Sequence, residues 1–153
     1  MSVSRRLARP MLAATFVSGG LDAVRHPEAK EAKADKVAPV IARLLGLFAD
    51  TPTLVRINGA VQVVAGTLLA TGRLPRVAAS VLAVSLVPTT LAGHRFWEEN
   101  GPQARAQRVH FLKNTAMLGG LILAAVDTEG RPSLGWRARR AAERAVQALP
   151  TTG

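Results

Sequence analysis

The sequence contains no cysteine and few aromatic residues. The lack of cysteine excludes disulfide bonds, thiolate metal sites and any thiol redox chemistry carried by this chain itself. Aromatic residues make up 4% of the chain although 48% of its residues are hydrophobic, so Ala, Val, Leu and Gly supply the apolar content, as in tightly packed membrane helices. The 153 residues suffice for one domain or one compact membrane bundle.

Acidic residues are also scarce, with 10 Asp and Glu against 20 Lys and Arg. A nucleic-acid-binding protein would concentrate this positive charge on one face or in a recognisable module. Here the cations lie between apolar runs, in groups at residues 5–9, 73–76 and 131–144. Membrane proteins place their cations in this way, at the ends of their spans. The charge pattern therefore predicts contact with a lipid bilayer and no nucleic-acid partner.

Four apolar segments have the length, or nearly the length, that crossing a bilayer requires. The first, at about residues 10–24, is short and has Arg9 just outside it. The other three, at about residues 53–72, 74–93 and 109–126, are apolar around most of the helix, which a small soluble bundle could not solvate. The short link between the second and third makes them antiparallel neighbours. The segments predict an all-α fold, a four-helix transmembrane bundle, with a soluble four-helix protein as the alternative.

Two further segments are amphipathic. Residues 37–48 are too short to cross, so we expect an amphipathic helix in the first loop that lies on the membrane surface or packs over the bundle. The tail predicts a basic C-terminal amphipathic helix on an anionic surface, or a plain solvated helix. The expected division is a membrane domain at residues 1–130 and a basic tail at residues 131–153. Paired arginines before an apolar run also occur in signal peptides, but no small-residue cleavage site follows, which favours an uncleaved first helix.

Polar residues gather at one end of the predicted bundle. The first helix ends, the second begins, the third ends and the fourth begins at the same membrane face, whereas the opposite end has almost nothing comparable within its spans. Ionisable groups at membrane depth are costly and tend to point inward at partners, so this face holds the candidate ligand-binding cluster. The cluster consists of Asp22, Arg56, Asn58, His94, His110 and Asn114.

Depth suggests how the members of this cluster pair. Asp22 and Arg56 lie about one turn inside the same face, which predicts a salt bridge or shared hydrogen-bond network, with snorkelling of Arg56 as the alternative. Asn58 and Asn114 are expected to hydrogen-bond across helices. His94 is expected to make an interfacial hydrogen bond or to handle protons for a ligand.

His94 and His110 flank the last connector, where they could face each other and hold a metal or haem. No haem-attachment motif C-x-x-C-H is present, and we predict neither a metal site nor a catalytic residue. Phe96 and Trp97 are expected to anchor this end at the membrane interface. Four spans place both termini on one side, and a small excess of Lys and Arg there favours cytoplasmic termini.

Four stretches of the sequence together resemble the DoxX family in its actinobacterial form. They are RPMLAATFVSGGLDAVRHP, LVRINGAVQVVAGTLLATGRLPR, VPTTLAGHRFWEE and HFLKNTAMLGGLILAAVDT, in this order between residues 9 and 128. The resemblance implies a four-helix integral protein of the bacterial plasma membrane. It also implies a place in a membrane-associated redox assembly that answers oxidative stress, with a superoxide dismutase and a sulfurtransferase as soluble partners.

These features favour a non-catalytic membrane subunit or scaffold whose polar end binds a lipid-soluble ligand or a soluble redox partner, without a cofactor of its own. The alternative is a quinone-linked membrane oxidoreductase subunit, with His94 near the quinone oxygen. A small transporter is a third class, which the small number of spans and the lack of an obvious repeat disfavour.

Overall fold

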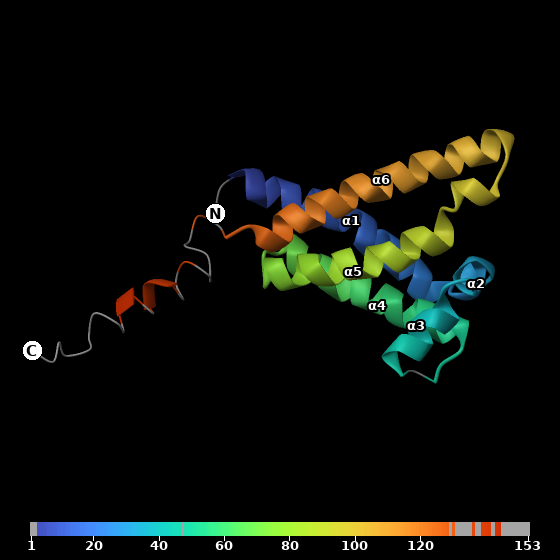
Figure 1. Cartoon of the computed structure of the whole chain (residues 1–153), viewed down its shortest axis with the longest axis horizontal. Coiled ribbons are helices and arrows are strands. Elements are labelled where there is room, and N and C mark those ends of the chain that lie inside the picture. Colours follow the sequence, from blue (N-terminus) through green and yellow to red (C-terminus); the bar gives the residue numbers. More distant parts are fainter. Residues whose placement is uncertain are drawn as a thin grey trace, which may run out of the picture.

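The computed structural model describes residues 3–46, 48–128, 130, 136, 139–141, 143 and 144. These residues form helices and connecting loops, without a strand, which confirms the predicted all-α class and is compatible with a four-helix bundle. The bundle consists of α1 (Val3–Arg25), α4 (Thr51–Ala70), α5 (Pro75–Gly93) and α6 (Gly101–Val126). At one of its ends, hereafter the rim, lie α2 (Glu28–Ala34), α3 (Ala38–Leu45) and the 3₁₀ helix η1 (Phe96–Glu98) (Figure 1).

Proline and glycine set several helix boundaries. A proline occupies the first or second position of α3, α4, α5 and α6, where its missing N–H breaks no hydrogen bond. α3 ends at Gly46, whose φ of +63° suits a left-handed C-cap. After α4, the Arg73 amide donates to the Leu68 carbonyl at 2.9 Å, which closes the tight link to α5. The two helices therefore pack as neighbours, as predicted.

Three helices of the described residues are long and apolar enough to cross a membrane, namely α4, the segment Pro75–Glu98 that contains α5, and α6. Their outward faces carry large apolar side chains such as Val64, Val84 and Leu123, which are 61, 74 and 71% exposed. Such faces are poorly solvated by water and well solvated by lipid hydrocarbon. The arrangement is that of a membrane protein.

The first helix differs from its prediction. Its span was expected to begin near residue 10, but α1 begins at Val3 and continues through Pro10. Arg9 is therefore inside the bundle, where it is only 5% exposed. α1 is not among the helices apolar enough to span a membrane, since its sequence carries several arginines and Asp22.

Small residues bring α1 and α4 into backbone contact. A Cβ atom on Gly20 would lie 2.6 Å from the Gly59 carbonyl oxygen, and one on Gly59 would lie 2.7 Å from the Gly20 oxygen. Gly66 faces Val17 in the same interface. Close packing by small residues was expected, but Gly19 takes no part in it, because a Cβ there would meet nothing within 4 Å.

The core lies between the four long helices. Phe16 of α1 is the aromatic residue among its buried members. Alanines of α4 and α5 let the helices approach closely. Its buried members are Ala13, Phe16, Ala65, Leu69, Ala78, Ala79, Leu82, Leu86 and Leu121.

Other predicted boundaries also shift. α6 begins at Gly101 rather than near residue 109, so the third connector is shorter than expected. The charged segment at residues 26–36 contains α2. The predicted helix in the first loop is present as α3. The tail at residues 131–153 lies largely outside the described residues. Its described residues, 136, 139–141, 143 and 144, are helical. The division into two parts at residue 130 stays a prediction.

Candidate functional site

Two pairs of residues join α5 and α6 at the rim, one turn apart. The deeper pair is Thr90 and Asn114, both buried, in which the Asn114 Nδ2 donates to the Thr90 Oγ1 at 3.0 Å. The outer pair is His94 and His110, whose rings stack with centroids 5.1 Å apart and planes 21° apart. We call these four residues the α5–α6 ladder. His110 and Asn114 share one face of α6, as their spacing predicted.

His94 is oriented by a second contact. Its Nδ1 lies 2.8 Å from the Oε1 of Gln107, one turn before His110 on α6. An amide oxygen accepts, so Nδ1 carries the hydrogen in this contact and Nε2 is left as an acceptor. The expected hydrogen bond of His94 is therefore present, with a partner, Gln107, that the sequence did not single out.

The geometry of the two rings argues against a shared metal or haem. An imidazole binds a metal in the plane of its ring, and two nearly parallel stacked rings do not direct their nitrogens at one point. The described residues also hold no group of three or more His, Cys, Asp or Glu side chains that could bind a metal ion.

Three aromatic rings, close in sequence to the outer pair of the ladder, contact one another at the rim. Phe96 contacts Trp97 and Phe111 edge to face at 5.1 and 5.4 Å between centroids, and Trp97 contacts Phe111 at 6.0 Å. Trp97 is 53% exposed. Rings of this kind prefer the boundary between hydrocarbon and headgroups, which is the role expected for Phe96 and Trp97.

An apolar groove between α5 and α6 contains the deeper pair of the ladder, Thr90 and Asn114. It encloses a volume of about 110 Å³, and its polar lining residues are Thr90, Asn114 and Thr115. Among the described residues no hydrogen bond uses the Asn114 amide oxygen, so this acceptor remains available within an otherwise apolar site. The groove is lined by Leu86, Val87, Thr90, Leu91, Phe111, Asn114, Thr115 and Leu118.

Asn58 belongs to a different network, on the α4 side of α5. The Ser85 Oγ donates to the Asn58 Oδ1 at 2.8 Å, and the Gln62 Nε2 donates to the same Ser85 Oγ at 2.9 Å. The Asn58 Nδ2 lies 3.3 Å from the Thr89 Oγ1. These bonds cross between helices, as predicted, and they tie α4 to α5 without facing the groove.

The predicted Asp22–Arg56 pair is wrong. Asp22 forms its ion pair with Lys30 of α2, because the chain folds back after α1 and brings this lysine over the last turn. The Arg56 Nε donates to the Val24 carbonyl at 3.4 Å, at the end of α1 where carbonyls lack helical partners. The two residues lie at similar depth, as expected, but each has its own partner.

The six candidate residues therefore do not form one site. His94, His110 and Asn114 come together on the ladder, whereas Asn58 lies in the α4–α5 network and Asp22 and Arg56 lie near the α1–α4 end. Sequence reasoning missed Thr90 and Gln107, and the only signal for Thr90 was its spacing of one turn from His94.

A second polar site at the rim lies beside His94. A pocket of about 170 Å³ is lined by polar side chains of α2, η1 and α6, including Lys33 and Gln107. Glu98 accepts from Arg95 at 2.7 Å and also pairs with Lys36, which holds α2 over the pocket.

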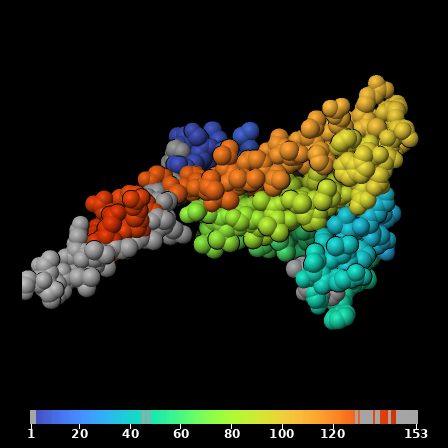
Figure 2. All heavy atoms as spheres, viewed as in Figure 1, coloured from blue at the N-terminus to red at the C-terminus, as the bar shows by residue number. Residues whose placement is uncertain are grey.

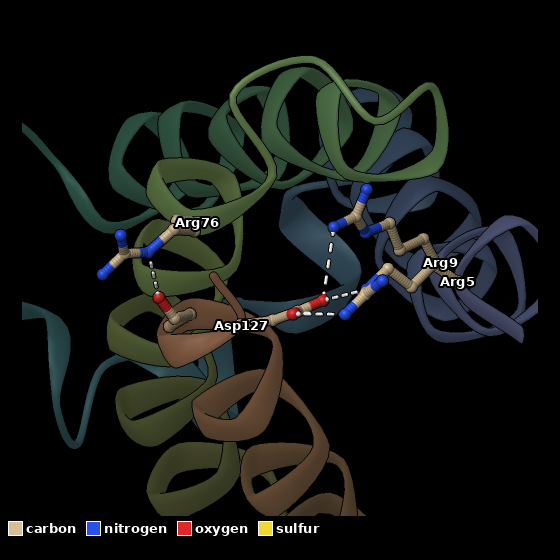
Figure 3. Close-up of polar contacts among 5 residues, drawn as sticks. Arg5, Arg9, Arg76 and Asp127 are labelled. Atoms are coloured by element: carbon tan, nitrogen blue, oxygen red, sulfur yellow. Dashed lines mark hydrogen bonds and ion pairs between the residues drawn. The ribbon is translucent and has the colours of Figure 1, made fainter. Parts of the chain in front are cut away.

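At the opposite end of the bundle almost nothing comparable was expected within the spans, but α1 begins earlier than predicted and carries Arg5 and Arg9 there. Arg5 donates to both carboxylate oxygens of Asp127, with its Nε at 2.7 Å and its Nη2 at 3.0 Å. The Arg9 Nη2 lies 3.5 Å from the same carboxylate. Figure 3 shows both arginines reaching from α1 to the end of α6, with Arg76 of α5 on the other side. We call Arg5, Arg9 and Asp127 the clasp.

The clasp closes the bundle between its first and last helices. α1 and α6 touch little elsewhere, so these ion pairs are the main link between them. Arg76 adds a cap, with its Nε donating to the Ala125 carbonyl at 2.9 Å (Figure 3). The signal in the sequence was the spacing of Arg5 and Arg9, which lie one turn apart on a helix that was expected to start after them.

Comparison with known families identifies the chain. The DoxX family model matches residues 5–95, which extend from α1 to the end of the α5 segment and make up more than half of the sequence. The chain belongs to the DoxX family. No curated protein and no solved structure matches it. The membrane character implied by the DoxX resemblance agrees with the three apolar helices. The matched residues end before α6, which carries His110 and Asn114.

Proposed function

We propose that this DoxX-family protein is a non-catalytic membrane subunit that binds a lipid-soluble molecule in the groove between α5 and α6. The observation that carries the proposal is the buried Asn114–Thr90 pair of the ladder in the lining of this groove. The apolar walls suit a hydrocarbon tail, Asn114 lies in the groove, and His94 follows Thr90 by one turn, outside the groove lining.

The polar groups suit a ligand whose head donates hydrogen bonds. The Asn114 amide oxygen accepts from a hydroxyl or amine, and so does the Nε2 of His94. The stacked His110 and the aromatic rings at the rim limit how far the head can tilt. No residue here has the partners of an activated nucleophile, and the chain without cysteine runs no thiol chemistry.

The DoxX resemblance supports a wider role for this binding. We place the protein in the bacterial plasma membrane, with cytoplasmic termini, as part of a redox assembly that answers oxidative stress. A superoxide dismutase and a sulfurtransferase are the soluble partners that the resemblance suggests. The rim offers such partners exposed charges on α2 and η1.

Ligand recovery tests the proposal. Thr115→Trp places a large ring at the groove wall without touching the core, and Leu123→Trp places the same ring on the 71% exposed lipid face of α6. The proteins are purified from native membranes, and the lipids and quinones that accompany them are analysed by mass spectrometry. We expect one class of molecule to accompany the wild type and Leu123→Trp and to be lost from Thr115→Trp. Identical profiles for all three would refute the groove as the site.

A second candidate function is a quinone-linked oxidoreductase subunit. It is favoured by the orientation of His94, whose free Nε2 lies at the depth where a quinol hydroxyl would need an acceptor. His94→Phe keeps a stacked ring but removes the acceptor. This variant should lose quinol binding and quinol oxidation by the purified assembly, and retention by wild type of a non-quinone lipid alone would exclude this function.

A further inference from the structure

The segment formed by α3 and the turn after it carries an apolar face that no described part of the chain covers. Val40 and Leu44, one turn apart on α3, and Phe48, which follows the end of the helix, are 58, 79 and 105% exposed. On its other side, α3 buries Ala38 and partly buries Ile41 against the neighbourhood of α4. The helix therefore has apolar side chains on both sides, and those turned away from the bundle lie beside the exposed Arg43.

The position of this face decides what can cover it. α4, one of the helices apolar enough to cross a membrane, begins at Thr51, immediately after the turn that contains Phe48. α3 therefore lies at the depth where α4 enters the bilayer. Figures 1 and 2 show α3 and its turn projecting from the side of the bundle, next to the start of α4. A segment that projects sideways from the bundle at this depth meets the interfacial layer of the bilayer, which is the nearest apolar surrounding for its exposed side chains.

We infer that Val40, Leu44 and Phe48 insert into the interfacial layer of the bilayer and anchor the rim at a fixed depth. An apolar face of this kind sits at the level between headgroups and acyl chains. Arg43, which is exposed beside Leu44, extends to the lipid phosphates from there. Because α3 is a short helix, it would bind lipid weakly alone, but its attachment to α4 raises its effective concentration at the surface.

The inference does not depend on the proposed ligand function. It concerns α3 and its turn, which lie outside the groove and the ladder. Insertion of α3 would give the protein a second membrane contact. This contact would hold the preceding helix α2 and the Lys36–Glu98 pair beside the rim pocket close to the bilayer surface.

The absence of cysteine makes a direct test practical, because each single-cysteine variant carries one label. Leu44→Cys and Phe48→Cys are spin-labelled in the full chain, in liposomes with anionic phospholipid. Val40→Cys serves as a third position, and Ala29→Cys, exposed on α2, as the matched control. Collision rates of each label with oxygen, which concentrates in hydrocarbon, and with a water-soluble nickel chelate report the depth.

We expect the ratio of oxygen to nickel collisions at residues 40, 44 and 48 to exceed that at residue 29 by about threefold or more, as for an interfacial helix. Equal ratios at all four positions would show that α3 lies in water and would overturn the inference. Labels at 40, 44 and 48 that are shielded from both reagents would also overturn it, since a protein surface, such as a second copy, would then cover the face.

Discussion

The two ends of the bundle handle polar groups within apolar surroundings in opposite ways. At the clasp, charged side chains meet directly, with two arginines of α1 on the single carboxylate of Asp127. On the α5–α6 ladder the groups are amide, hydroxyl and imidazole, joined by one hydrogen bond and one ring stack. Charged groups at the rim, such as Asp22 with Lys30, lie on its surface.

The difference separates structure from function. A desolvated charge is tolerated only when its partner is in place, so the clasp is committed to holding α1 and α6 together. Neutral groups cost less to bury and still have hydrogen-bonding capacity, which the ladder leaves facing a groove. We therefore expect changes at the clasp to affect stability, and changes at the ladder to affect binding.

Asp127→Asn should produce the largest loss of stability. It leaves Arg5 and Arg9 without this carboxylate, and the expected decrease in the free energy of unfolding is about 2–3 kcal/mol, less than for a fully buried pair because Arg5 and Asp127 are partly exposed. Unfolding by sodium dodecyl sulfate in mixed micelles measures it. Asp35→Asn, the same change at an exposed position, is the control and should have little effect. Equal stability of the two variants would mean that the clasp does not close the bundle.

Gly20→Ala tests whether close packing, rather than charge, holds the rim half of α1. The added methyl group would lie 2.6 Å from the Gly59 carbonyl oxygen, so the helices must separate, at a cost of about 2 kcal/mol. The neighbouring Gly19→Ala meets nothing within 4 Å and should leave stability unchanged or slightly raised. The same unfolding assay compares them, and matching losses would contradict the packing described for α1 and α4.

Asn114→Leu should separate binding from stability. Loss of its hydrogen bond to Thr90 should cost about 1 kcal/mol, as is usual between helices in a membrane, while the groove loses its central acceptor. Asn58→Leu, in the α4–α5 network, is the matched control with a similar expected cost. Only Asn114→Leu should lose the co-purified ligand, and loss from both variants would place the ligand elsewhere.

Lys36→Gln should have the smallest effect on stability. Its ion pair with Glu98 is partly exposed at the rim, where such pairs contribute about 0.5 kcal/mol or less. The change should instead loosen α2, seen as faster proteolysis at this helix in liposomes. Lys33→Gln, at a lysine with no ion pair among the described residues, is the control. Identical cleavage rates would show that this pair does not hold α2.

Pattern and spacing predicted more of the ladder than of the clasp. His110 and Asn114 share a helix face by spacing alone, and His94 was expected opposite them because the two helices are joined by one connector. The clasp was not predicted. Because Arg5 and Arg9 are charged, the first membrane span was predicted to begin after them. A charged residue can be buried when an oppositely charged partner lies beside it. Here the partner, Asp127, is 122 residues away from Arg5 in the sequence, so the sequence did not indicate the pair.

The sequence by itself determined the all-helical class, the apolar faces turned to lipid and the family, because hydrophobicity and its helical period are properties of neighbouring residues. Only the tertiary structure decided which polar groups meet. Lys30 rather than Arg56 pairs with Asp22, and Asp127 receives both arginines of α1, because such pairings depend on how the ends of helices distant in sequence are brought together.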